Sequence, residues 1–126
     1  MTTLLSIVES PSHPKLSSLY RRLGITEVRA GSMRKAIKQL KSVQPDFVVA
    51  EFFYGFGNNY AGVNMSNLDV FLYSLPKFAP RARVIVLVDK SELQYARKLA
   101  EMFPLHALLP QPVTERAILP VLREQA

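Results

Sequence analysis

Polar side chains that could do chemistry stand directly after several apolar runs of the sequence. Glu9 and Ser10 follow the first run, Glu51 follows a central run, and Gln111 follows the last. Carboxylates can hold a divalent cation or exchange a proton, whereas hydroxyl and amide groups can hydrogen-bond an anion. A site built from these residues would handle a metal ion, a proton or a phosphoryl group.

The cysteine and histidine content excludes several other kinds of site. The 126 residues contain no cysteine, which excludes disulfides, thiol catalysis, iron–sulfur clusters and cysteine-ligated zinc. The two histidines, His13 and His106, cannot supply three imidazole ligands. His13 could act as a general base only with a nucleophile such as Ser10 or Ser12, and no G-x-S-x-G motif is present. We therefore expect His13 to be an ordinary loop residue, His106 to be structural, and the protein not to be a hydrolase.

The segment after the first apolar run lacks the features of a phosphate-binding loop. Residues 9–14 contain no glycine, and Pro11 and Pro14 have no backbone N–H to offer a phosphate. Gly55 and Gly57 form a Gly-x-Gly pair, but the rest of the dinucleotide fingerprint is missing. We expect no nucleotide, flavin or other cofactor.

Strand-like and helix-like segments alternate along the chain. Short apolar runs typical of strands occupy 4–8, 27–30, 47–50, 84–88 and 107–109. Apolar residues recur at helical spacing over 16–23, 33–43, 68–75, 96–103 and 117–122. The run at 47–50 is apolar on both faces, as in a central parallel strand covered on both sides. Ser6 lies within the first strand, where we expect its hydroxyl to be satisfied locally.

Several residues predict where the helices begin and end. Gly24 stands where a helix C-cap glycine belongs, and Ser32 and Thr114 are suitable N-caps. Pro76 is expected to end the third helix, and Pro120 to kink the fifth or break its first turn.

The alternation of strands and helices predicts an α/β fold. Right-handed crossovers between parallel strands place helices on both faces of one sheet. Five strands and five helices in this length fit a flavodoxin-like, doubly wound parallel sheet of order 2-1-3-4-5, as a single domain over residues 1–126. Ligands of such sheets bind beyond the carboxyl ends of the strands, where the candidate residues are expected to meet.

Four segments in this order resemble those of response-regulator receiver domains. They are Ile7-Val8-Glu9-Ser10, Pro45-Asp46-Phe47-Val48-Val49-Ala50-Glu51, Val84-Ile85-Val86-Leu87-Val88 and Leu108-Leu109-Pro110-Gln111-Pro112-Val113. The resemblance covers essentially the whole chain. It implies a signalling domain in which an aspartate accepts a phosphoryl group from a histidine kinase beside a bound Mg²⁺.

The chain departs from that family at each position that carries its chemistry. By the resemblance, Glu51 stands at the phosphoacceptor aspartate, Glu9 and Ser10 at the acid pair, Val88 at the Thr or Ser, and Gln111 at the lysine. Lengthened and missing carboxylates weaken a Mg²⁺ site, and the loss of the lysine removes the counter-charge of a phosphoryl group. We expect phosphotransfer to be lost, although a weak Mg²⁺ site at Glu9 and Glu51 stays open.

Glu51 allows three interpretations. It could mimic a phosphorylated aspartate permanently, or still accept a phosphoryl group as part of a phosphorelay. The interpretation we favour is a solvated carboxylate at a strand end, hydrogen-bonded to water or to nearby backbone N–H groups, since the residues that would bind a phosphate are replaced.

Two surfaces are candidates for contacts with a partner. A glycine-rich loop after Glu51 carries the aromatic residues Phe53, Tyr54, Phe56 and Tyr60, which could form a binding surface or dimer contact, or could fold back over the empty pocket. The resemblance implies an output face on the fourth helix that includes Gln94, Tyr95, Lys98 and Met102.

The positive charge is concentrated in the first part of the chain. The formal net charge is +6, and residues 1–45 hold eight basic and two acidic side chains whereas the remainder is balanced. The second predicted helix carries a basic patch of Arg34, Lys35, Lys38 and Lys41. We interpret it as a solvated helix face, with binding of nucleic acid or an acidic partner as the alternative. No helix-turn-helix or RNA-recognition signature accompanies it.

The sequence therefore predicts a non-enzymatic, cytoplasmic, bacterial signalling or adaptor domain. Its expected partner is a signalling protein or a component of a histidine-kinase pathway, with a homodimer as a further possibility. We expect no membrane span, because the longest wholly apolar run is 84–88.

Overall fold

The computed structural model describes residues 2–11, 13–54 and 66–123. Strands and helices alternate in the predicted order, as follows: β1 (Thr2–Ile7), α1 (Ser17–Arg22), β2 (Ile25–Ala30), α2 (Met33–Gln39), β3 (Phe47–Glu51), α3 (Asp69–Phe78), β4 (Arg83–Val88), the 3-10 helix η2 (Lys90–Glu92), α4 (Leu93–Met102), β5 (Ala107–Pro110) and α5 (Glu115–Arg123).

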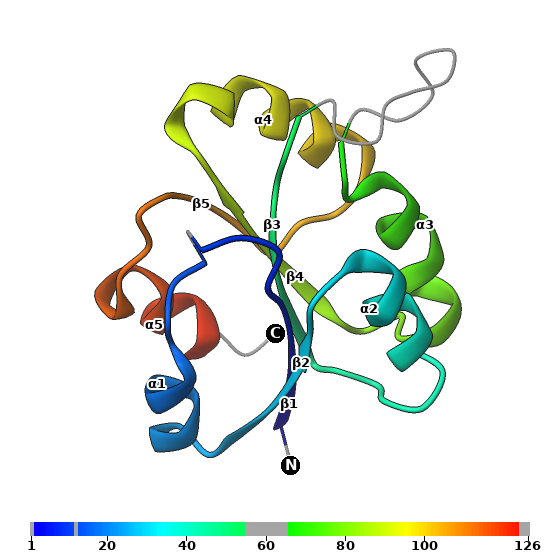
Figure 1. Cartoon of the computed structure of the whole chain (residues 1–126), viewed down its shortest axis with the longest axis vertical. Helices are drawn as coiled ribbons and strands as arrows, with labels where there is room; N and C mark the ends of the chain where they lie inside the picture. The colour runs from blue at the N-terminus through cyan, green and yellow to red at the C-terminus, as the bar shows by residue number, and fades with distance from the viewer. Residues whose placement is uncertain (1, 12, 55–65, 124–126) are drawn as a thin grey trace.

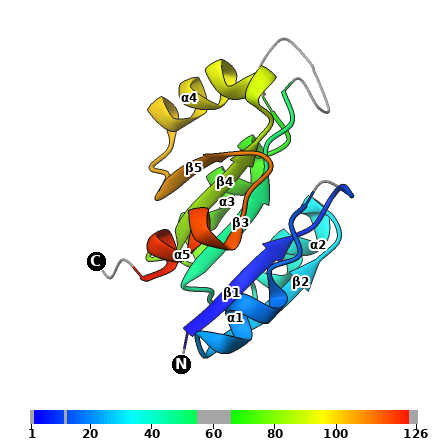
Figure 2. The same cartoon turned by 90° about the vertical axis from the view of Figure 1, so that its left-hand side faces the viewer.

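The five strands form one parallel sheet of order β2-β1-β3-β4-β5, which confirms the predicted fold class. Figure 1 shows α1 and α5 on one side of the sheet and α2 and α3 on the other. The side view in Figure 2 shows β1 and β2 at one end of the sheet and β5 at the other. Since the strands are parallel, their carboxyl ends lie along one edge, where β1 and β3 are direct neighbours.

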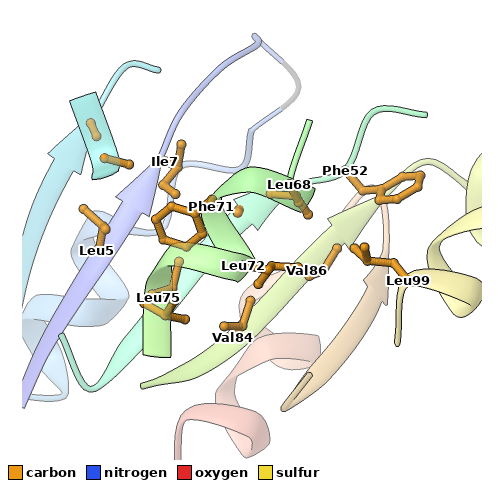
Figure 3. Close-up of a cluster of buried hydrophobic side chains, with 14 of the residues drawn as sticks. Leu5, Ile7, Phe52, Leu68, Phe71, Leu72, Leu75, Val84, Val86 and Leu99 are labelled. Carbon is orange, nitrogen blue, oxygen red and sulfur yellow. The ribbon is translucent and has the colours of Figure 1, made fainter. Parts of the chain in front are cut away.

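Two hydrophobic clusters hold the helices on the sheet. One packs α2, α3 and α4 against the sheet, and Figure 3 shows Phe71 and Leu75 of α3 in it beside Leu5 and Ile7 of β1. The other packs α1 and α5 on the opposite face, with Leu19 and Ile118 fully covered. The two clusters follow from the alternation of side chains along each buried strand.

The predicted caps are present in the structure. Ser32 Oγ accepts a hydrogen bond from the backbone N–H of Lys35 (3.2 Å), and Thr114 Oγ1 accepts one from Ala117 (3.2 Å). Each bond gives an N–H of the first helical turn a side-chain acceptor. Among the described residues, no helix has the length and apolar character needed to cross a membrane.

Three details of the helix predictions are wrong. Pro76 lies inside α3, which continues to Phe78, because packing of the buried residues around it outweighs the lost backbone bond. The first turn of α5 is unbroken although Pro120 lies inside the helix, and a kink at Pro120 stays a prediction. The second helix ends at Gln39, short of the predicted end at 43, and Ala100 is exposed.

Gly24 provides a prediction about the α1–β2 turn. Its φ is +75°, a conformation that strains any residue with a Cβ. Gly24→Ala is expected to lower the free energy of unfolding by about 1 kcal/mol, measured by urea denaturation. Gly31→Ala is the matched control, because Gly31 has neither a positive φ nor an atom within 4 Å of an added Cβ, and an equal loss in both variants would contradict the strain argument.

Candidate functional site

Glu51 ends β3 at the carboxyl edge of the sheet and is almost completely buried. Its side chain is 1% exposed, beside the loop that follows β1. The predicted exposure of this carboxylate to solvent is therefore wrong, whereas the predicted hydrogen bonds from nearby backbone N–H groups are present. The β1–β3 pairing brings the start of the β1–α1 loop next to Glu51, so the loop closes over the carboxylate.

Both oxygens of the Glu51 carboxylate accept hydrogen bonds from the β1–α1 loop. Oε2 accepts from the backbone N–H groups of Glu9 (2.9 Å) and Ser10 (3.2 Å), and Oε1 accepts from the hydroxyl of Ser10. His13 Nδ1 lies 3.1 Å from Oε2 and adds a fourth donor. These donors satisfy the carboxylate within the protein.

His13 connects Glu51 to a serine of β1. Its other ring nitrogen, Nε2, lies 3.3 Å from Ser6 Oγ, and all three side chains are buried. In the tautomer that carries a proton on Nδ1 and none on Nε2, His13 donates to the carboxylate and accepts the proton of the Ser6 hydroxyl. We call Ser6, Ser10, His13, Glu51 and the N–H of Glu9 the Glu51 network.

The sequence analysis did not predict two members of this network. It placed His13 in a loop, which is correct, but assigned it no role in the site. It expected Ser6 to be satisfied locally, whereas its partner is His13, seven residues away. One signal in the sequence could have indicated the role of His13. A carboxylate buried at the end of β3 needs a hydrogen-bond donor, and the β1–α1 loop that reaches the same edge of the sheet contains a histidine.

Asn67 holds the opposite side of the site together. Its Nδ2 donates to Glu9 Oε1 (2.8 Å) and to the backbone carbonyl of Glu51 (2.8 Å), and its Oδ1 accepts from the N–H of Phe53 (2.8 Å). The sequence analysis did not identify Asn67, because its partners are 14 to 58 residues away in the chain.

The donor set does not fit a Mg²⁺ ion. Within the described part of the chain, no group of three or more His, Asp or Glu residues could hold a metal. Both Glu51 oxygens and Glu9 Oε1 already accept hydrogen bonds from protein groups. Mg²⁺ needs oxygen ligands in a near-octahedral arrangement, and these oxygens are directed at protein donors instead. We therefore assign no metal chemistry to these residues.

Val88 and Gln111 lie together at the neighbouring strand ends. Val88 is fully buried in the cluster under α2, α3 and α4, and its carbonyl accepts a hydrogen bond from the N–H of Gln111 (2.7 Å). An apolar side chain at Val88 has no hydroxyl to offer an anion. The roles that the resemblance implies for the two positions stay predictions.

Tyr54 and Tyr95 join the predicted loop surface to the predicted output face. Their rings stack with centroids 3.8 Å apart and an interplanar angle of 17°, and the Tyr54 N–H donates to Glu92 Oε1 (3.2 Å). Tyr54 is 48% exposed, Phe53 is half-buried, and Phe56 and Tyr60 lie outside the described residues. Phe52 belongs to the core.

The other predicted surface residues are exposed. Gln94, Lys98 and Met102 lie on the outside of α4, and Tyr95 is half-buried. The basic residues Arg34, Lys35, Lys38 and Lys41 are also exposed, on and just after α2.

The ionisation of Glu51 makes stability depend on pH. Burial alone would raise the pKa of Glu51, but the hydrogen bonds from His13, Ser10 and the Glu9 N–H outweigh burial and lower it. The unfolded chain therefore binds a proton more tightly at Glu51, and the stability that this residue contributes is lost as pH falls below about 4. Burial raises the pKa of Glu9, which acts in the opposite sense, with stability lost as pH rises through the raised value.

The Glu51→Gln variant separates the pH-dependent contribution of Glu51 from that of Glu9, because Glu9 is present in both the variant and the unmodified protein. We expect the unfolding free energy of the unmodified protein to fall more steeply than that of Glu51→Gln between about pH 5 and pH 3. Urea denaturation over this range measures both slopes. Parallel curves would show that Glu51 keeps the same pKa in the folded and unfolded chains.

The solved structures that resemble this chain include response regulators. One, from Desulfuromonas acetoxidans, is 16% identical, with 98% of this chain and 94% of that chain covered and a TM-score of 0.71. The chain has the receiver fold. No protein-family model and no curated protein sequence matches it.

Two further structures show the range of proteins with this receiver fold. A response regulator from Burkholderia pseudomallei, with a phosphorylated aspartic acid, a calcium ion and citrate, is 21% identical (98% and 67% covered, TM-score 0.65). The other is described as a member of a novel family of redox sensors in the streptococci that evolved from two-component response regulators (17% identical, 98% and 49% covered, TM-score 0.71).

Proposed function

We propose that this receiver-fold chain is a non-enzymatic signalling domain that recognises a protein partner and does not take up a phosphoryl group. The single observation that carries the proposal is the saturation of the Glu51 carboxylate by four donors of the Glu51 network. A carboxylate must leave such donors and align with the phosphorus to attack it. Burial of the side chain and the unsuitable metal-ligand set support the same conclusion.

The redox sensors of the streptococci support the proposal by analogy. These sensors evolved from two-component response regulators, so a receiver fold can serve an input other than phosphorylation. For this chain, the partner surface we propose is the stacked pair Tyr54 and Tyr95 with exposed Met102 on α4. Aromatic and methionine side chains are enriched at protein interfaces.

A phosphodonor experiment tests the first half of the proposal. The chain is incubated with acetyl phosphate and Mg²⁺, beside a phosphorylatable receiver domain as the positive control, and its intact mass is measured. We expect no phosphoryl adduct. An adduct that Glu51→Gln abolishes would overturn the proposal and establish the phosphorelay alternative.

A capture experiment tests the second half. Proteins from the source cells that bind the immobilised chain are compared with those that bind Tyr95→Ala and Lys38→Ala. We expect to find a protein that the Tyr95→Ala variant no longer captures and that the Lys38→Ala variant still captures. Lys38 belongs to the basic patch and serves as the control position. The reverse pattern, or capture of nucleic acid, would favour the basic patch as the binding surface.

A further inference from the structure

A pocket of about 370 Å³ opens beside the Glu51 network. It lies between the β1–α1 loop and the strands β1 and β2, and it has the size of pockets that hold small molecules. Its walls include Ser6, His13, Lys15, Ser17, Glu27 and Arg29.

The charge of this pocket favours an anion. Lys15 and Arg29 are exposed cations on its wall, and Glu27 is the one acidic side chain among the lining residues. Glu27 Oε1 accepts a hydrogen bond from Ser17 Oγ (2.6 Å), so part of its charge is already engaged by the protein. A guanidinium and an ammonium together suit a phosphate or carboxylate group.

The buried part of the pocket wall belongs to the Glu51 network. Ser6 and His13 both line the pocket and are buried, and the parallel β1–β2 register pairs Ser6 with Arg29. His13 thus meets the pocket on one side and contacts Glu51 Oε2 on the other. Any group that hydrogen-bonds to His13 or Ser6 in the pocket competes with the contact that orients the ring.

We propose that this pocket binds a small molecule bearing a phosphate or carboxylate group, and that His13 passes its occupancy to Glu51. The inference rests on the proposed function, since it supplies an input to a domain that takes up no phosphoryl group. Lys15 and Arg29 attract and orient the anion, and Ser6 and His13 contact the ligand from the pocket wall. Reorientation of the His13 ring then alters the hydrogen bonds that hold the β1–α1 loop on Glu51.

Nuclear magnetic resonance of the histidine rings tests the pocket directly, because the chain has two histidines. The probes are glucose 6-phosphate, glucuronate and neutral glucose, which share a sugar ring and differ in the anionic group. We expect at least one anion to shift the His13 ring signals while glucose does not. His106 is the internal control, since its Nε2 lies 3.0 Å from the carbonyl of Val121, on the α5 side of the molecule. The comparison of the two anions separates phosphate from carboxylate recognition.

Variants of the cationic residues complete the test. The double variant Lys15→Gln/Arg29→Gln is expected to weaken anion binding about tenfold or more. The control variant Lys38→Gln, on α2, is expected to leave anion binding unchanged. The pocket proposal is overturned if neither anion shifts His13, if glucose acts equally, or if the double variant binds as before. Transmission to Glu51 is measured at the backbone amides of Glu9 and Ser10, and unchanged amide signals on binding would overturn that step.

The outcome is distinguishable from failure of the proposed function. Phosphorylation of Glu51 is detected by intact mass, and ligand binding by the His13 signals, so either can fail alone. A phosphoryl adduct on Glu51 together with shifted His13 ring signals would support anion binding in the pocket. It would contradict the proposal that this binding replaces phosphorylation as the input.

Discussion

His13→Ala is expected to lower the free energy of unfolding by about 3 kcal/mol, because it removes the hydrogen-bond partner of two buried polar side chains, Glu51 and Ser6. Glu51 would keep the donors from Ser10 and Glu9 but lose the His13 contact at 3.1 Å. Ser6 Oγ would lose its partner at 3.3 Å as well. A buried polar group without a partner costs the full free energy of its lost hydration. Urea denaturation at neutral pH measures the loss.

The control for this prediction lies two residues further along the same loop. Lys15→Ala removes an exposed side chain and is expected to change stability by less than about 0.5 kcal/mol. A double-mutant cycle of His13→Ala with Glu51→Gln then isolates the pairwise contact. Additive losses would show that His13 stabilises the fold by packing alone, and would also weaken its proposed part in passing a signal.

Phe71→Ala is expected to cost about 3–5 kcal/mol of unfolding free energy, because it leaves a cavity in the cluster that fixes α3 on the sheet. Phe71 is completely buried, and Figure 3 shows its ring between Leu5 and Ile7 of β1 and the other apolar residues of α3. The loss combines the transfer free energy of the ring with the contacts that its neighbours lose. Thermal and urea denaturation measure it.

Val70→Ala is the matched control on the same helix. Val70 is 53% exposed, so its truncation removes little buried surface and should change stability by less than about 0.5 kcal/mol. Equal losses at the two positions would mean that α3 is held by its backbone and helix propensity rather than by burial of one face. Asn67 lies just before α3. Loosening of this helix should therefore also disturb the hydrogen bonds that Asn67 Nδ2 donates to Glu9 Oε1 and to the Glu51 carbonyl.

The Glu51 network explains how this receiver fold keeps a buried, ionised carboxylate at the end of β3. The β1–α1 loop supplies side-chain and backbone donors that balance the charge of this carboxylate. Charge-assisted hydrogen bonds of this kind stabilise an ionised carboxylate in a buried place. The position therefore becomes a structural element that links β1, the loop and β3.

Much of the fold was predictable from local patterns. The run at 47–50 is apolar on both faces, which requires helices on both sides of β3, and the strand–helix alternation with right-handed crossovers then restricts the strand order. Ser32, Thr114 and Gly24 act within a few residues of themselves, so their roles were also predictable. Pro76 was not, because the packing of a whole helix face decided whether α3 continued.

The sequence by itself predicted that Glu9, Ser10 and Glu51 meet at one edge of a parallel sheet, as the structure shows. Only the tertiary structure decided what Glu51 does there. Its ring partner His13 is 38 residues away, and Asn67, which holds its backbone carbonyl, is 16 residues away. Such contacts depend on how a loop closes over a strand end, which residue periodicity does not encode, because periodicity reports burial of a face and not the partner of a side chain.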